Sequence, residues 1–171
     1  GIAAYTDHPE HVLTVGSCSK TYAMTGWRLG WLAGDRHLTD EVVTIHESTT
    51  ACASSVAQHA AIAALTGPQE PFDEMYDAFE ARRDLVVDRV ASIDGLSCPR
   101  PEGAFYAYLD PGLDEPALDV ATYLLEEHGV VLAPGDGFGE TTPGRLRLSF
   151  ASSPAELREG FDRIEAGLDA Y

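Results

Sequence analysis

The first part of the chain shows short apolar runs of the kind that form strands. A β-branched apolar run over about residues 11–15 ends at Gly16, which predicts a buried strand followed by a loop that carries Lys20. Over residues 27–31, two tryptophans and a leucine alternate with a charged and a small residue, and this alternation predicts a second short strand. In such a strand Arg28 lies on the face opposite the bulky side chains, away from the core.

Three helical patterns follow these strands. Residues 35–48 predict an amphipathic helix, and residues 54–65 predict an alanine-rich helix that ends at a Gly-Pro pair. Over residues 72–93 the apolar side chains recur at helical spacing, which predicts a longer helix. The segment 67–70 between the second and third helices is interpreted as a hinge between two substructures, residues 1–68 and residues 69–171.

The part of the chain beyond the hinge helix predicts a small α/β unit. Short strands are expected near residues 104–109, 130–132 and 145–150, with a helix near residues 117–128. The last helix has a clear start, because Ser153 and Glu156 have the spacing of a capping box and Pro154 occupies the first helical position. The chain as a whole is therefore expected to be α/β, with one substructure on each side of the hinge.

The charge of the chain is strongly acidic. Eleven Lys and Arg stand against 28 Asp and Glu, which gives a formal net charge of −17. Such a surface repels phosphate backbones and anionic lipids, so binding to nucleic acid or to a membrane is not expected. The acidic residues are spread through the predicted elements. Two interpretations remain open: adaptation to high salt, which screens self-repulsion, and ordinary acidic solubility.

The cysteines and the start of the chain bear on disulfides, metal binding and cellular location. Cys18, Cys52 and Cys98 are widely spaced, with no CxxC pair and no histidine at ligand spacing, so neither a disulfide framework nor a metal site is expected. No apolar run approaches membrane-spanning length and no signal-peptide pattern is present, which favours the cytoplasm. The chain opens without a methionine, as a fragment of a longer protein would.

Ser17, Lys20 and Arg28 are candidate chemical groups on or beside the loop after the first strand. A positioned, partly desolvated lysine is the residue type that attacks a carbonyl cofactor, because the reaction needs a neutral amine. The Ser17 hydroxyl and the planar fork of Arg28 match the needs of a phosphate group. A lysine after a strand is, however, more often a solvated surface residue, so these positions alone do not settle the question.

The surrounding motifs resemble class I/II aminotransferases of the pyridoxal-phosphate-dependent fold type I superfamily. The string SCSKTYAMTGWRLG (residues 17–30) is similar to the lysine-site signature of that family, whose best-known members are aspartate aminotransferases. Further blocks occur in family order along the rest of the chain: VAQHAAIAAL, ARRDLVVDRV, PEGAFY, PGDGFG and RLRLSFASS. The resemblance implies the C-terminal part of such an enzyme, with the end of the large mixed-sheet domain in residues 1–68 and the small α/β domain in residues 69–171.

The resemblance also assigns roles to individual residues. Lys20 matches the lysine that holds pyridoxal 5'-phosphate as a Schiff base and moves a proton during the reaction, and Ser17 and Arg28 match the ligands of the cofactor phosphate. Arg147 matches the arginine that receives the substrate α-carboxylate. Strand alternation puts Arg145 and Arg147 on the same face and does not choose between them. Amino-acid and 2-oxo-acid substrates and a homodimer are implied in the same way.

Several groups that the family needs are not found upstream of Lys20. An acid for the pyridine nitrogen, a tyrosine for the ring hydroxyl and a phosphate loop precede the lysine in the family, and Tyr5 and Asp7 lie too close to Lys20 to match them. We therefore expect this chain to be inactive without its N-terminal part. A lyase or synthase of the same fold, and the aminotransferase-like effector domain of a transcription regulator, remain alternatives.

Overall fold

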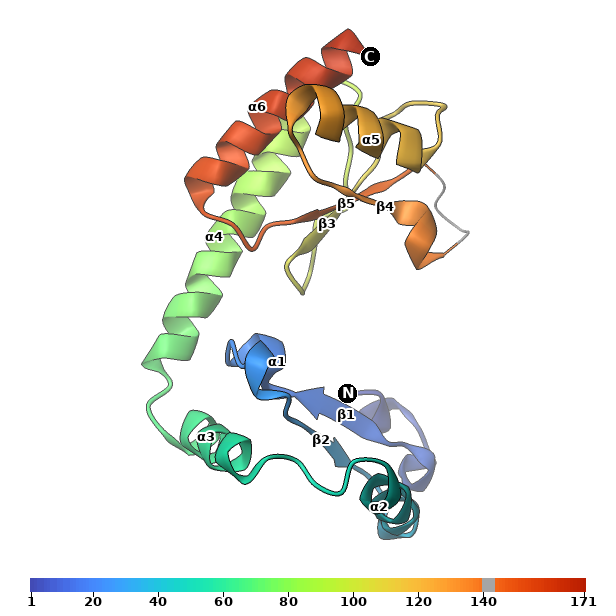
Figure 1. Ribbon diagram of the computed structural model, residues 1–171, viewed down its shortest axis with the longest axis vertical. Helices are drawn as coiled ribbons and strands as arrows, with labels where there is room; N and C mark the ends of the chain where they lie inside the picture. The colour runs from blue at the N-terminus through green and yellow to red at the C-terminus, as the bar shows by residue number, and fades with distance from the viewer. Residues whose placement is uncertain (140–143) are drawn as a thin grey trace. The chain divides into compact units, whose positions relative to one another are not determined.

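A computed structural model describes residues 1–139 and 144–171 of the chain (Figure 1). The chain forms two compact units, Gly1–Glu74 and Met75–Tyr171, and helix α4 (Glu70–Ser92) contains the division between them. The predicted division into a large-domain portion, 1–68, and a small domain, 69–171, remains a prediction. Over the described residues, no helix is long and apolar enough to cross a membrane.

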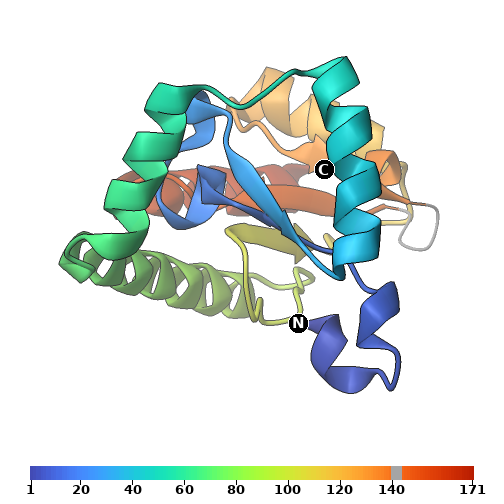
Figure 2. The same ribbon diagram turned by 90° about the horizontal axis from the view of Figure 1, so that it is seen from below.

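The first unit is built on an antiparallel pair of strands, β1 (Thr14–Ser17) and β2 (Gly30–Ala33). Helices α2 (Arg36–Thr49) and α3 (Ser55–Thr66) lie at opposite ends of this pair, as the views in Figures 1 and 2 agree. The helices predicted over 35–48 and 54–65 are thus confirmed to within a residue. Short 3-10 helices are formed by Ile2–Tyr5, Pro9–His11 and Thr25–Trp27.

Two details of this unit correct the expectations from sequence. The first strand begins at Thr14, because the residues before it form the 3-10 turn Pro9–His11. Lys20 lies in a one-turn helix, α1 (Cys18–Thr21), where a loop was predicted. The second strand begins only at Gly30, so Arg28 is not a strand residue: its backbone is left-handed, with φ 52° and ψ 49°. The alternation of bulky residues over 27–31 predicted a strand. In the structure, residues 25–28 instead form a 3-10 turn that ends in the left-handed Arg28.

The second unit has a three-stranded antiparallel sheet in the order β3 (Tyr106–Leu109), β5 (Leu146–Ser149), β4 (Ala133–Pro134). One face of the sheet shares a buried core with α4, α5 (Ala117–His128) and α6 (Pro154–Ala170) (Figure 1). Leu146 and Leu148 point into this core, and Arg147 and Ser149 alternate with them on the other face. The predicted α/β unit and the two faces of its last strand are confirmed.

The strand predicted over 130–132 is wrong, because β4 comprises only Ala133–Pro134. The end of α5 explains the difference. Gly129 takes a left-handed conformation, with φ 65°, and the Val130 N–H donates to the Leu124 carbonyl at 2.9 Å. This hydrogen bond closes the helix and uses a donor that a strand ladder would need. Val130 and Leu132 are still buried, so the apolar pattern correctly indicated that these residues belong to the core.

The start of α6 has the capping box that the sequence predicts. The Ser153 N–H donates to Glu156 Oε2 at 2.8 Å, and the Glu156 N–H donates to Ser153 Oγ at 3.3 Å. The bond from the Ser153 backbone is the main reason that the pKa of Glu156 lies below its usual value. Leu157, Phe161 and Ile164, which form an apolar stripe along this helix, are buried.

This lowered pKa predicts an acid-dependent loss of stability. A group whose pKa is lower in the folded state stabilises the fold above its unfolded pKa, about 4.3 for Glu, and loses that contribution as the pH falls through the folded pKa. Between about pH 6 and pH 3, the full-length protein should therefore lose more stability than its Glu156→Gln variant. Urea denaturation across this range measures the difference. Glu126→Gln, on the surface of α5, is the control and should follow the wild type; equal pH dependence in all three proteins would contradict the prediction.

Candidate active site

Ser17 and Lys20 lie at the two ends of the short helix α1. Ser17 is the last residue of β1 and caps the helix, because its Oγ accepts a hydrogen bond from the Ser19 N–H at 3.0 Å. Its own hydroxyl hydrogen is still available to donate. Lys20 is exposed in the last turn of the helix, and it is the single lysine among the 171 residues. This cap therefore fixes the point at which the chain leaves β1 and begins the helix that carries Lys20.

Arg28 is brought to the same end of the strand pair by a series of hydrogen bonds. The Cys18 N–H donates to the Leu29 carbonyl at 3.2 Å, just beyond the paired strands. The Thr25 hydroxyl donates to the Ser19 carbonyl at 3.0 Å, and Arg28 Nη1 donates to the Thr25 carbonyl at 3.0 Å. The turn 25–28 is thus bonded to α1. The structure places Ser17, Lys20 and Arg28 together at this end, although their roles remain predictions.

The close approach of the two strands depends on a glycine. A Cβ at Gly30 would lie 2.6 Å from the Gly16 carbonyl oxygen, which is too close for a side chain without movement of the backbone. Gly30 pairs with Ser17 in the strand register. This glycine therefore allows the strand that follows Arg28 to lie directly against the residue that caps the lysine helix.

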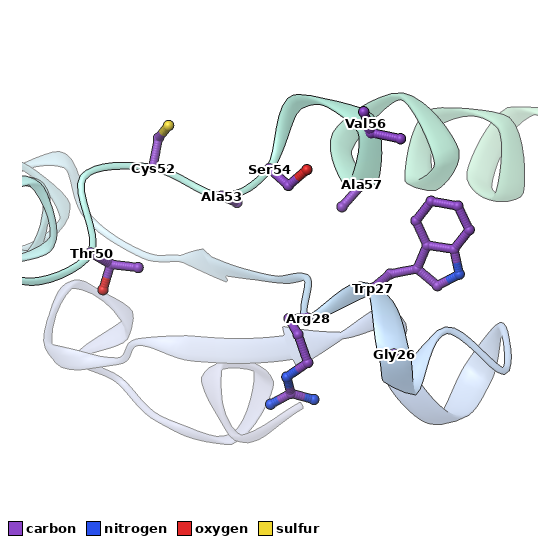
Figure 3. Close-up of a pocket in the computed structure, with 9 residues that line it drawn as sticks. All are labelled: Gly26, Trp27, Arg28, Thr50, Cys52, Ala53, Ser54, Val56 and Ala57. Carbon is purple, nitrogen blue, oxygen red and sulfur yellow. The ribbon is translucent and has the colours of Figure 1, made fainter.

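Arg28 lines an open hollow of about 640 Å³, together with Thr50, Ser54 and their neighbours (Figure 3). Figure 3 shows its side chain pointing away from the loop that carries Cys52 and Ala53. Among the described residues no carboxylate pairs with Arg28, in a chain that has 28 acidic residues. The exposed guanidinium of Arg28 and the hydroxyl of Ser17, at the same end of the strand pair, are donor types that fit a phosphate group.

The second unit carries the two arginines that the sequence could not separate, and they have different surroundings. Arg145 Nη2 lies 3.4 Å from Asp110 Oδ2, so its charge is partly compensated within the unit. Arg147 forms no ion pair with any carboxylate in residues 1–139 or 144–171. Its guanidinium carbon lies 4.4 Å from the centre of the Tyr106 ring and 4.2 Å from that of Phe138. Of the two arginines, Arg147 is thus the one that has no carboxylate partner among the described residues.

The segment that carries Phe138 is tied to the sheet. The Gly135 N–H donates to the Arg145 carbonyl at 2.7 Å, and the Tyr108 hydroxyl donates to the Gly135 carbonyl at 3.0 Å. A Cβ at Gly135 would lie 2.5 Å from the same Arg145 oxygen, so only glycine fits this approach. Sequence reasoning identified PGDGFG as one of the family blocks and did not single out Phe138. The aromatic residue directly after the second glycine of this motif was the only available signal.

The predicted residues are therefore brought together in two groups. Ser17, Lys20 and Arg28 form one group in the first unit, and Arg147 with its two aromatic neighbours forms the other in the second unit. In the described parts of the chain, no cluster of three or more His, Cys, Asp or Glu side chains could hold a metal ion.

Comparison with known proteins identifies the family. Residues 2–164 match the family model of aminotransferase class I and II. Aspartate aminotransferase of Rhizobium meliloti is 42% identical over 92% of this chain, which spans 40% of that enzyme. A crystal structure of an aspartate aminotransferase from Rhizobium meliloti matches with a TM-score of 0.87 at 40% identity, over 94% of this chain and 42% of that one. The aromatic aminotransferase of Pyrococcus horikoshii matches with a TM-score of 0.93 at 31% identity, over 99% of this chain and 46% of that one.

These matches confirm the predicted fold class, an α/β part of a fold type I transferase. They also cover the strings on which the resemblance rested, from the lysine motif through the last strand. The chain spans about 40% of the length of the curated relatives that it matches. With a family match over most of its residues and relatives that share about two residues in five, the chain belongs to the class I and II aminotransferase family.

Proposed function

We propose that this chain is the lysine-bearing part of a pyridoxal-phosphate-dependent aminotransferase, which transfers an amino group between an amino acid and a 2-oxo acid. The observation that carries the proposal is the grouping of Ser17, Lys20 and Arg28 at one end of the β1–β2 pair, in a chain of this family. Pyridoxal phosphate, when bound, supplies a ring that takes up the negative charge developing at the substrate Cα.

The residues of the first unit have distinct tasks in this proposal. The Ser17 hydroxyl and the Arg28 guanidinium donate charge-assisted hydrogen bonds to the phosphate and so fix the position of the cofactor. The Lys20 amine anchors the cofactor covalently when no substrate is bound. With the cofactor bound, the freed amine would take the proton from the substrate Cα and deliver it to C4′ of the cofactor, as a general base and then a general acid.

Arg147 has the corresponding task for the substrate. Its fork donates two parallel hydrogen bonds to the α-carboxylate, a group that all amino acids and 2-oxo acids share. This residue therefore recognises the substrate class without selecting among side chains. The matched relatives named above include aspartate and aromatic aminotransferases, and the proposal accordingly stops at the class. Homodimer assembly and a cytoplasmic location belong to the same proposal and rest on the resemblance and on the sequence pattern.

Borohydride reduction of the full-length protein tests the lysine assignment. Reduction in the presence of pyridoxal phosphate should attach a pyridoxyl group to Lys20, because only a carbonyl joined to that amine is converted to a stable secondary amine. Peptide mapping by mass spectrometry locates the label. The Lys20→Arg variant, which keeps the charge, is the control and should not be labelled in this peptide. A label on a lysine elsewhere in the full-length protein would overturn the assignment.

Substitution of the two arginines of β5 tests the substrate assignment. In the full-length enzyme, Arg147→Gln should raise the KM of both substrates by about 10- to 100-fold, since a hydrogen bond from a charged donor contributes roughly 1.5 to 3 kcal/mol. Arg145→Gln, the matched control on the same face of the same strand, should change KM by no more than about threefold, because Arg145 is paired with Asp110. Steady-state kinetics for each substrate would contradict the assignment if the larger effect came from Arg145.

A further inference from the structure

We propose that Phe138 and Tyr106 are positioning residues for Arg147, holding its guanidinium between two ring faces so that its hydrogen-bonding edge is presented to the substrate carboxylate. This inference rests on the proposed function and deepens it, since it concerns how the substrate class is recognised. It adds two residues, neither of which donates a hydrogen bond to the substrate, to the recognition of the carboxylate.

The geometry is that of a cation held between two aromatic rings. The Arg147 guanidinium carbon lies 4.4 Å from the Tyr106 ring centre and 4.2 Å from the Phe138 ring centre. Both distances are well inside the roughly 6 Å range in which a ring face attracts a cation. A guanidinium is planar: rings attract it through its faces, whereas a carboxylate binds along its N–H edge. The two interactions are therefore compatible, and the rings restrict the directions from which a carboxylate approaches.

The choice of partners keeps the charge of Arg147 available. Arg145, on the same face of β5, is paired with Asp110 at 3.4 Å and so already has an anionic partner. A carboxylate beside Arg147 would compete with the substrate for the same hydrogen bonds. Carboxylates are the commonest charged groups in this chain, which has a net charge of −17. Two aromatic faces stabilise the cation without occupying its donors, which suits a residue that must bind an anion reversibly.

Both rings are themselves held in place within the second unit. Tyr106 lies in β3, where it pairs with Ser149 of β5, and its ring centre is 4.4 Å from that of Phe105. Phe138 follows the loop that Gly135 ties to the Arg145 carbonyl. The Phe138 side chain is 56% exposed, so the unit does not need it for its core. Substituting Phe138 therefore probes its contact with Arg147 with little risk to folding.

The test compares four variants at position 138 in the full-length enzyme. Phe138→Ala and Phe138→Leu should raise KM for both substrates by roughly 2- to 5-fold with kcat changed less than about 1.5-fold, the range expected for loss of a cation–π contact whose ring is half exposed. Phe138→Tyr and Phe138→Trp keep a ring face and should stay near wild type. Leucine separates the ring face from mere apolar bulk. Tyr171→Ala, another half-exposed aromatic residue of this unit, is the control and should leave KM unchanged.

Two further measurements exclude a merely structural effect. The competitive inhibition constant of propionate, a carboxylate without an amino or oxo group, should rise by the same factor in Phe138→Ala. In an Arg147→Gln background, Phe138→Ala should have no further effect on KM, because the two residues act through one contact. Unchanged KM in Phe138→Ala, a leucine variant like wild type, or additive effects with Arg147→Gln would each overturn the inference.

The outcome also separates this inference from the proposed function. A full-length protein that transfers no amino group would overturn the proposed function, and direct calorimetry of propionate binding to wild type and Phe138→Ala would then decide the positioning role alone. An active enzyme in which Phe138→Ala has a wild-type KM would leave the proposed function in place and reject the positioning role.

Discussion

Replacing Lys20 by alanine is expected to lower kcat of the full-length enzyme by at least about 100-fold, since a positioned acid–base group alone contributes roughly 10²- to 10⁴-fold. The loss should appear in kcat and not in KM, because Arg147, which we propose receives the carboxylate, is untouched. The variant should also fold normally. Lys20 is exposed in the last turn of a one-turn helix, so its side chain is no part of a core.

The Lys20→Arg variant is the informative companion. It keeps a positive charge at the same place and should be as inactive as Lys20→Ala, because an arginine is not deprotonated near neutral pH and provides no neutral amine. Added methylamine should restore part of the turnover of Lys20→Ala, since a small amine can enter the space that the side chain has left. Turnover measured for all three proteins, with circular dichroism as the folding control, decides the matter. Wild-type turnover in Lys20→Ala would refute the central role of this residue.

The second large effect is expected in the core of the second unit. Leu124 of α5 is fully buried, and its Cδ2 would lie 2.6 Å from a Cβ at Gly167 of α6, so the two helices meet there without a gap. Leu124→Ala should lower the free energy of unfolding by about 2 to 5 kcal/mol through lost burial and the cavity left behind. Urea denaturation of the full-length protein, followed by circular dichroism, measures the change.

Leu118→Ala is the matched control for this substitution. It makes the same chemical change in the same helix, but Leu118 is 60% exposed. We expect its effect to stay within about 0.5 kcal/mol, as for most surface substitutions. Similar losses in the two variants would mean that the apolar stripe of α5 has been assigned to the wrong face.

Helix positions were predictable because their signals are local. The capping box of α6, the Gly129 that ends α5 and the Asp35 that caps α2 are each contained in a few neighbouring residues. The strand over 130–132 was mispredicted because strand pairing, unlike a helix end, is not determined by neighbouring residues. The apolar residues there are buried in the core. Whether their backbone forms a strand depends on hydrogen bonds to a partner strand elsewhere in the chain. Periodicity alone does not report that partner.

The candidate site was predictable in its residue types and not in its contacts. A motif identified Lys20 and Arg28, yet the left-handed backbone of Arg28 follows from the hydrogen bonds of the turn and contradicts the simple alternation of residues 27–31. Arg145 and Arg147 share a strand face in the sequence. They become different only in the folded chain, where Asp110 lies beside Arg145 and Phe138 lies beside Arg147.

One property of Lys20 has a practical use beyond mechanism. Because it is the single lysine of these 171 residues and is exposed in α1, any amine-directed acylating reagent has one side-chain target in this part of the protein. Acylation of the peptide that contains it therefore reports how often the amine is unoccupied. Mass-spectrometric footprinting of that single peptide would give cofactor occupancy in a crude extract, without purification and without an activity assay.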